Sequence, residues 1–259
     1  MSAPTLSRVG GVVSADIAVP QHEQEVRFYA SVLTTGATPL WREDLMNNRG
    51  VPIIGLGEHK EEYGELPLQW MPHIQVADVG ASAAAALERG AQEVMHGKDE
   101  NGVSQWAVLL DPDGAAFGLI PVVSEEQLPP SDGTGPEGCI GWLDLTVADA
   151  SKARDFYCAV VGWTAQDAAR ADASGDYADF TLLGSDGKPA AGVCHARGDC
   201  QGRPAVWLIT LPVGDLEESL RRVRAEGGQV LHERRDESGA CTHAVIQDPV
   251  GVHLALIPG

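Results

Sequence analysis

The alternation of apolar and polar positions predicts a regular succession of short strands and helices. The segments ADIAV, from Ala15, and LDLTV, from Leu143, alternate with the period of a strand that buries one face, and each precedes a stretch with helical spacing. A second strand in each half, MPHIQV at 71–76 and WLITLPV at 207–213, leads to an acid and another helix. Asp215 is expected to cap the second of these helices, which the double glycine at 227–228 ends.

This succession occurs twice in the chain of 259 residues. When the segment from Val12 is aligned with the segment from Ile140, Asp16 meets Asp144, and a Phe-Tyr pair at 28–29 meets another at 156–157. Farther along, two tryptophans align, and the turn DPDG at 111–114 aligns with DPVG at 248–251. An insertion rich in Gly, Pro and Asp, at 185–204, separates the two aligned blocks of the second copy. The sequence therefore predicts two homologous domains.

The domain boundaries follow from composition. The first domain is expected at 1–122 and the second at 138–259. Between them, 123–137 is rich in Pro, Gly and acid and lacks periodicity, as is typical of a linker. Each domain halves again into two units of a strand, a helix and further strands. The whole chain is expected to contain four such units.

Paired βαβββ units, the helix motif ARDFYCAVVGW at 153–163 and the terminal DP-x-G strand resemble the vicinal oxygen chelate superfamily. That superfamily includes glyoxalase I, extradiol dioxygenases, fosfomycin resistance enzymes and bleomycin resistance proteins. The resemblance implies an α+β fold with two tandem glyoxalase-like domains, in which each pair of βαβββ units forms a ligand cup. The chain is particularly similar to two-domain actinobacterial members that are often labelled glyoxalase or hydroxylase.

The resemblance also implies six positions for metal ligands, on the first and last strands of the units. Metal-dependent members carry His, Gln, Glu or another carboxylate at these positions. None of the residues found here is a competent ligand of that kind. The six residues are Ser14, Met71, Gly118, Trp142, Leu208 and Ala255. We therefore expect no metal and no cofactor.

A shift of two residues keeps the same strand face and brings polar side chains to the cups. The first cup then holds Asp16 and His73, and the second holds Asp144, Thr210 and His253. Asp16 and His73 either satisfy each other and the backbone, recognise a ligand, or act in catalysis as base and orienting group. The predicted ligand-binding residues are Ser14, Asp16, Met71, His73, Trp142, Asp144, Leu208, Thr210 and His253.

Charge and composition indicate which classes of partner the chain is expected to bind. The formal charge of -19 argues against nucleic acid, which is bound by clustered Lys and Arg. The chain has no long apolar run, so we expect a cytoplasmic protein that contacts no membrane. We also expect a monomer or a homodimer. Its five cysteines show no CxxC spacing and are expected to be free thiols.

The leading functional hypothesis is metal-independent binding of a bulky, partly aromatic small molecule, for antibiotic sequestration or the handling of a secondary-metabolite intermediate. Trp142 would offer a stacking surface, and Asp16 and Asp144 would pair with a cationic group. One alternative is a hydroxylase, lyase or cyclase of secondary metabolism that uses Asp16 and His73. Another is a metal-dependent, glyoxalase-like or dioxygenase-like enzyme with a different strand register. A third is an interaction module with a vestigial cup.

Overall fold

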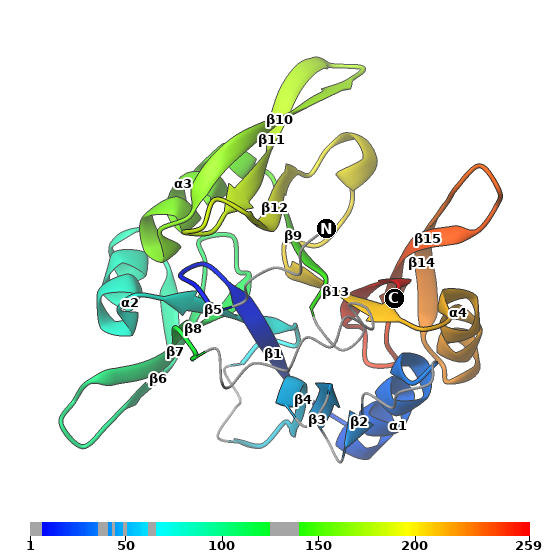
Figure 1. The fold of residues 1–259 in the computed structure, drawn as a ribbon, viewed down its shortest axis with the longest axis horizontal. Coiled ribbons are helices and arrows are strands. Elements are labelled where there is room, and N and C mark those ends of the chain that lie inside the picture. The colour runs from blue at the N-terminus through cyan, green and yellow to red at the C-terminus, as the bar shows by residue number, and fades with distance from the viewer. Residues whose placement is uncertain (1–6, 36–40, 43–44, 49–50, 62–65, 125–139) are drawn as a thin grey trace. The chain divides into compact units, whose positions relative to one another are not determined.

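The computed structural model describes residues 7–35, 41–42, 45–48, 51–61, 66–124 and 140–259 (Figure 1). The chain packs as two compact units that are each described separately below. Unit 1 comprises Met1–Val13, Met71–Leu128 and Leu143–Trp207, and unit 2 comprises Ser14–Trp70, Pro129–Trp142 and Leu208–Gly259. Each unit thus combines one half of each sequence repeat.

Unit 1 holds two βαβββ modules. The first contains β5 (Met71–Val76), α2 (Val79–Glu88), β6 (Gln92–Lys98), β7 (Ser104–Leu110) and β8 (Ala116–Pro121), in the spatial order β5-β8-β7-β6. The second contains β9 (Trp142–Val147), α3 (Ala150–Val161), β10 (Thr164–Asp172), β11 (Gly175–Leu183) and β12 (Pro189–His195), in the order β10-β11-β12-β9. A 3-10 turn, η3 (Gly198–Cys200), follows β12. Helices α2 and α3 lie side by side (Figure 1).

Unit 2 has the same construction. Its first module contains β1 (Val12–Val19), α1 (His22–Leu33), β2 (Trp41–Arg42), β3 (Leu45–Asn48) and β4 (Val51–Glu58), in the order β2-β3-β4-β1. Its second contains β13 (Trp207–Val213), α4 (Leu216–Ala225), β14 (Gln229–Arg235), β15 (Cys241–Gln247) and β16 (His253–Pro258), in the order β13-β16-β15-β14. Helices α1 and α4 lie side by side, blue against orange in Figure 1. The four predicted βαβββ modules are therefore confirmed.

The aspartate of the first DP-x-G turn is a buried hydrogen-bond acceptor in the core of unit 1. Trp207 Nε1 donates to the hydroxyl of Tyr157 at 2.8 Å, and that hydroxyl donates to Asp111 Oδ2 at 2.9 Å. The other carboxylate oxygen of Asp111 accepts from the amide of Ala115 at 2.8 Å. The turn closes through Gly114, whose φ of 89° suits glycine. The repeated motif therefore joins the last strand to the helix layer.

Unit 2 repeats this arrangement around Tyr29. The Tyr29 hydroxyl donates to Asp248 Oδ2 at 2.8 Å, and its ring packs edge-on against Trp70 at 5.5 Å between centroids. Trp70 and Trp207, the two tryptophans that align in the sequence repeat, are 1% and 0% exposed, so both belong to the core. Burial raises the pKa of the Tyr29 hydroxyl well above its ordinary value, so it stays a donor.

Helix capping follows the sequence in three of the four modules. Asp78, Asp149 and Asp215 each accept a hydrogen bond from an amide in the first turn of the helix that follows. The fourth helix, α1, begins after Gln21, which has a left-handed backbone and makes no side-chain cap. The predicted cap at Asp215 is confirmed, with a distance of 2.9 Å to the amide of Glu218.

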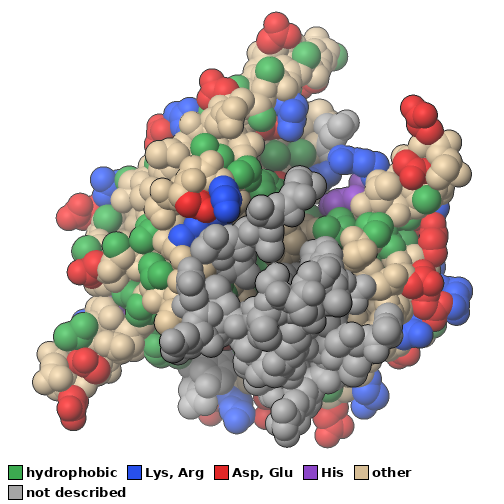
Figure 2. Space-filling view, viewed as in Figure 1, with side chains coloured by type: hydrophobic (Ala, Val, Ile, Leu, Met, Phe, Trp, Pro, Cys, Tyr) green, Lys and Arg blue, Asp and Glu red, His purple; other side chains and the backbone are tan. Residues whose placement is uncertain are grey.

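Acidic side chains lie at the outer ends of the β6–β7 and β14–β15 hairpins (Figure 2), whose turns contain Asp99-Glu100 and Asp236-Glu237. Among the described residues, no helix has both the length and the apolar character needed to cross a membrane. The predicted linker at 123–137 lies outside the described residues except for Val123 and Ser124. The predicted domain boundaries stay a prediction.

Candidate functional site

Strand alternation separates a helix-covered face from an opposite face in each module. On β9, Leu143, Leu145 and Val147 are at most 1% exposed, as expected for side chains under a helix. Trp142, Asp144 and Thr146 therefore share the opposite face. These opposite faces carry all of the predicted ligand-binding residues.

The first such face, called the Asp144 face, consists of Asp144, Thr146, Asp179 and Cys194 in unit 1. Strand β12 runs parallel to β9 with Cys194 opposite Thr146. Asp179, on β11, is 4% exposed. It accepts from the backbone amide of His195 at 2.9 Å, and its other oxygen accepts from Arg170 Nε at 3.2 Å. This face is polar and partly buried, and the hydrogen bonds from His195 and Arg170 hold the side chain of Asp179.

The second face, called the Leu208 face, lies on β13, β15 and β16 of unit 2. Leu208, Val245 and Ala255 form a buried apolar cluster. Thr210 is directly opposite Ala255, and His253 lies two residues before it on the same side of β16. Burial lowers the pKa of His253, and the charge of Asp248 only partly opposes this. The structure therefore brings Leu208, Thr210 and His253, which the sequence predicted as ligand-binding residues, onto one face.

On β8, the last-strand position is Gly118, and a side chain from a neighbouring strand fills the space above it. His73 on β5 lies directly opposite Gly118 on β8. A Cβ added to Gly118 would lie only 2.8 Å from His73 Cδ2, because the imidazole ring covers the glycine. Met71, on the same side of β5, is 5% exposed. The predicted residues Met71 and His73 thus share a face on which the ring of His73 fills the space above Gly118.

The remaining predicted residues lie on β1 and at the start of β9. Asp16 is exposed on β1 opposite Gly55 of β4, and Ser14 is half-buried on the same strand. Trp142 is half-buried at the start of β9. Asp16 and His73 belong to different packing units, so their action as a pair stays a prediction.

The donor set does not fit a divalent metal ion. No group of three or more His, Cys, Asp or Glu side chains that could hold one occurs among the described residues. Gly118 lies under an imidazole ring, and Ala255 lies among apolar side chains. A metal centre of the usual kind needs several converging oxygen or nitrogen donors.

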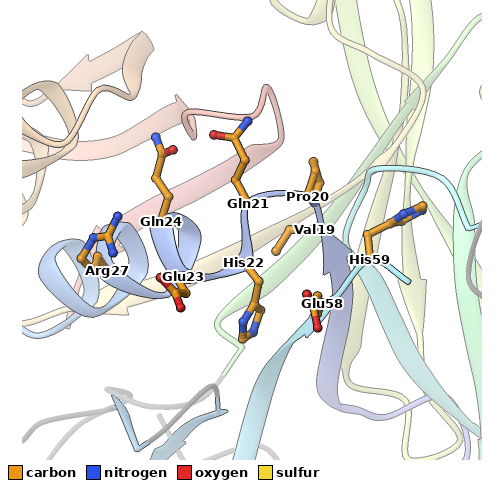
Figure 3. A pocket seen from close by; sticks show the side chains of 9 residues that line it. All are labelled: Val19, Pro20, Gln21, His22, Glu23, Gln24, Arg27, Glu58 and His59. Atoms are coloured by element: carbon orange, nitrogen blue, oxygen red, sulfur yellow. The ribbon is translucent and has the colours of Figure 1, made fainter. Parts of the chain in front are cut away.

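Sequence reasoning missed one pocket in unit 2, of about 550 Å³, at the start of α1 (Figure 3). Gln21 and Gln24 line it from the helix side, and Glu58 and His59 line it from the end of β4. His22 Nε2 is 3.0 Å from the carbonyl oxygen of Leu56. The one sequence signal is that glutamine stands where the other three helices have a capping aspartate.

A buried carboxyl in α1 is a second feature that the sequence did not indicate. Glu25 is 0% exposed. Burial, followed by the nearby charge of Asp248, raises the pKa of Glu25 to about 8. Glu25 is therefore protonated in the folded protein at neutral pH.

The family is established by comparison with known proteins. The profile of the Glyoxalase/Bleomycin resistance protein/Dioxygenase superfamily matches residues 139–256, and that of a glyoxalase-like domain matches residues 13–120. The chain belongs to this superfamily. The two matches coincide with the two sequence repeats, so the superfamily fold occurs twice in tandem.

Two related sequences are anthracycline biosynthesis proteins of Streptomyces. The anthracycline biosynthesis protein DauV of Streptomyces sp. is 26% identical over 201 residues, which cover 78% of this chain and 69% of DauV. DnrV of Streptomyces peucetius, also an anthracycline biosynthesis protein, is 27% identical over 201 residues, which cover 78% of this chain and 69% of DnrV.

The solved structures support the fold alone. A variant of homoprotocatechuate 2,3-dioxygenase from B. fuscum has a TM-score of 0.59 and 13% identity, covering 100% of this chain and 73% of that one. The 2,3-dioxygenase LapB from Pseudomonas has a TM-score of 0.56 and 13% identity, covering 98% and 94%.

Proposed function

We propose that this protein binds a bulky, partly aromatic small molecule of secondary metabolism without a metal ion. The supporting observation is the surroundings of the two last-strand positions. Gly118 is covered by His73, and Ala255 is packed with Leu208 and Val245. Apolar walls with a few polar groups are typical of sites for organic ligands.

The polar side chains on these faces indicate which functional groups such a ligand would carry. Asp144 is half-buried on the same face as the buried Asp179, and Thr210 and His253 lie at the apolar cluster of another face. A half-buried carboxylate favours a cationic group, because screening by water is weaker there than at the surface. The names of the relatives make anthracyclines the first compounds to test.

The test is a calorimetric titration of the purified chain, in the presence of a chelator, with an anthracycline and with polycyclic aromatic amines and their neutral analogues. We expect saturable binding that Trp142→Ala weakens about tenfold through lost stacking. Asp144→Asn should weaken only the amines, and Asp176→Asn, an exposed change on β11, should weaken none. Binding that appears only when a divalent metal is added would contradict the proposal.

Enzymatic action in secondary metabolism is the second candidate, and the biosynthetic names of DauV and DnrV favour it. In that case Asp16 would act as the base and His73 as the orienting group. Asp16→Asn would then abolish turnover of the bound compound while its affinity stayed within about twofold. Absence of any turnover by the unaltered chain would leave the binding function alone.

A further inference from the structure

The β6–β7 hairpin of unit 1 holds three hydrogen-bonded side chains outside the Asp144 face and the Leu208 face. Glu93 and His96 lie on β6, and Ser104 begins β7. His96 Nδ1 is 2.8 Å from Glu93 Oε2, and His96 Nε2 is 2.8 Å from Ser104 Oγ. A serine, a histidine and a carboxylate connected in this order form the arrangement that activates a serine hydroxyl as a nucleophile.

Two irregularities of strand register bring these side chains together. Residues three apart on a regular strand face opposite sides, so Glu93 and His96 would point away from each other. The pairing of β6 with β7 shifts between them, so that Glu93 lies opposite Leu109 and His96 opposite Ala107, which are both buried. A second shift, just before the pair that contains Ser104, turns the hydroxyl to the same side. Bulges re-aim side chains in this way and are frequent next to active sites.

The hydrogen bonds define the role of each group. The Glu93 carboxylate only accepts, so His96 Nδ1 donates to it. In the neutral imidazole Nε2 is then the acceptor, and the Ser104 hydroxyl donates to it. The side chains of His96 and Glu93 are 13% and 38% exposed. His96 is therefore placed as the base for Ser104, and Glu93 is a positioning residue that orients the ring.

The hydroxyl of Ser104 lies beside the first turn of α2. A Cβ added to Gly80 would lie 3.1 Å from Ser104 Oγ, which leaves space for only a small group next to the helix. The first amides of a helix have no acceptor within the helix, and they form its positive end. Such donors stabilise the negative charge that develops on a carbonyl oxygen under attack. Ser104 is half-buried, so a small molecule can approach it.

The equivalent hairpin of unit 2 lacks this arrangement. Strand β14 carries Glu233 opposite Ala244, where β6 carries His96 opposite Ala107. The first residue of β15 is Cys241, whereas β7 begins with serine. Both hairpins have two register shifts, so the fold of the hairpin does not require the three polar groups.

We propose that Ser104, His96 and Glu93 form an esterase site for short-chain carboxylic esters. Ser104 Oγ attacks the carbonyl carbon, and its proton passes to His96 Nε2. The bond from that carbon to the alcohol oxygen breaks, and the alcohol leaves with the proton. Water then attacks the acyl-serine and gives a proton to His96, which returns it to the serine oxygen as the acid leaves. The reaction consumes one ester and one water.

A fluorophosphonate probe, which bonds covalently to activated serines, tests the site in the full chain. We expect mass spectrometry of the digested protein to locate the label on Ser104. Labelling should be absent from Ser104→Ala and about hundredfold slower in His96→Gln. Ser238→Ala, an exposed change in the turn between β14 and β15, should leave the rate within about twofold. Unfolding in urea should abolish the labelling, because it separates the three groups.

Hydrolysis of p-nitrophenyl acetate tests the reaction and the role of Glu93. Ser104→Ala should remove the activity that the probe inhibits. Glu93→Gln should lower kcat about tenfold and leave KM within about twofold, because a misplaced imidazole affects the transition state more than ester binding. Glu93→Asp should restore part of kcat, and thermal unfolding checks that each variant folds.

Three results would overturn the proposal. They are a folded parent chain without label on Ser104, unchanged labelling in a folded His96→Gln, and unchanged hydrolysis in Ser104→Ala. The first and third need no variant other than Ser104→Ala, so they decide the question even if His96→Gln fails to fold. None of these outcomes depends on the small-molecule binding proposed above.

Discussion

Glu25 marks the clearest difference at the residue scale between the two packing units. In unit 1 the equivalent position of α3 is Ala153, and Tyr157 alone reaches the turn aspartate from that helix. In unit 2 both Tyr29 and Glu25 interact with Asp248. The core of unit 2 therefore contains two carboxyl groups whose negative charges would repel each other, an arrangement that favours keeping one of them protonated.

The stability of unit 2 should consequently fall as pH rises. The ordinary pKa of a glutamate is 4.5 and that of folded Glu25 is about 8, so unfolding releases a proton between these values. The contribution is complete below 4.5 and is lost as pH rises through about 8. Glu25→Gln, which cannot ionise, should remove most of this dependence and exceed the parent chain by a few kcal/mol in alkaline solution.

Urea unfolding at about pH 6 and about pH 9 measures this effect. Glu23→Gln is the matched control, because Glu23 is exposed in the same helical turn. The account fails here if Glu25→Gln and the parent chain lose the same stability between the two conditions.

A substitution at Gly118 tests whether the ring of His73 fills the space of the missing last-strand carboxylate. Gly118→Ala should destabilise the chain by about 1–2 kcal/mol, because the new Cβ meets the imidazole and must displace it. In the background of His73→Ala the same substitution should cost less than about 0.5 kcal/mol. A double-mutant cycle by denaturant unfolding gives the coupling free energy between Gly118→Ala and His73→Ala. A coupling near zero would show that the ring does not occupy this space.

At the scale of elements, the helices were predictable where local chemistry decides them. Asp78, Asp149 and Asp215 each precede a helix and cap it, and the glycine after α3 adopts a positive φ of 84°. Helix α1 departs from this pattern. Its first turn is entered through Gln21 with a φ of 58°, which no propensity of glutamine indicates. The adjoining pocket was missed for the same reason.

The left-handed backbone at Gln21 should make glycine favourable at that one position. Gln21→Gly is expected to raise the free energy of unfolding by about 0.5–1 kcal/mol, because glycine adopts this conformation without a steric penalty. Gln24→Gly, inside the first turn of α1, should lower it by about 1 kcal/mol. Thermal and urea unfolding show whether each variant raises or lowers the free energy of unfolding. Destabilisation by both would contradict the backbone assignment at Gln21.

At the scale of the whole molecule, the sequence repeats predicted four modules and two superfamily domains, which the fold and the family profiles confirm. The sequence did not indicate that helix packing joins α1 with α4 and α2 with α3. An amphipathic helix shows which face it buries, but not which partner covers that face. For the same reason the sequence placed Leu208, Thr210 and His253 on one face, but could not show that the ring of His73 covers Gly118.

The central claim is that an organic ligand is bound without a metal, and its most direct test is the metal content of protein purified without a chelator. The same preparation is then heated with and without added Ni, Zn, Mn or Fe, since a ligand of the native state raises the melting temperature. We predict far less than one bound metal per chain and no metal-dependent shift. Near-stoichiometric metal, or a clear rise in melting temperature with one of these ions, would contradict the account.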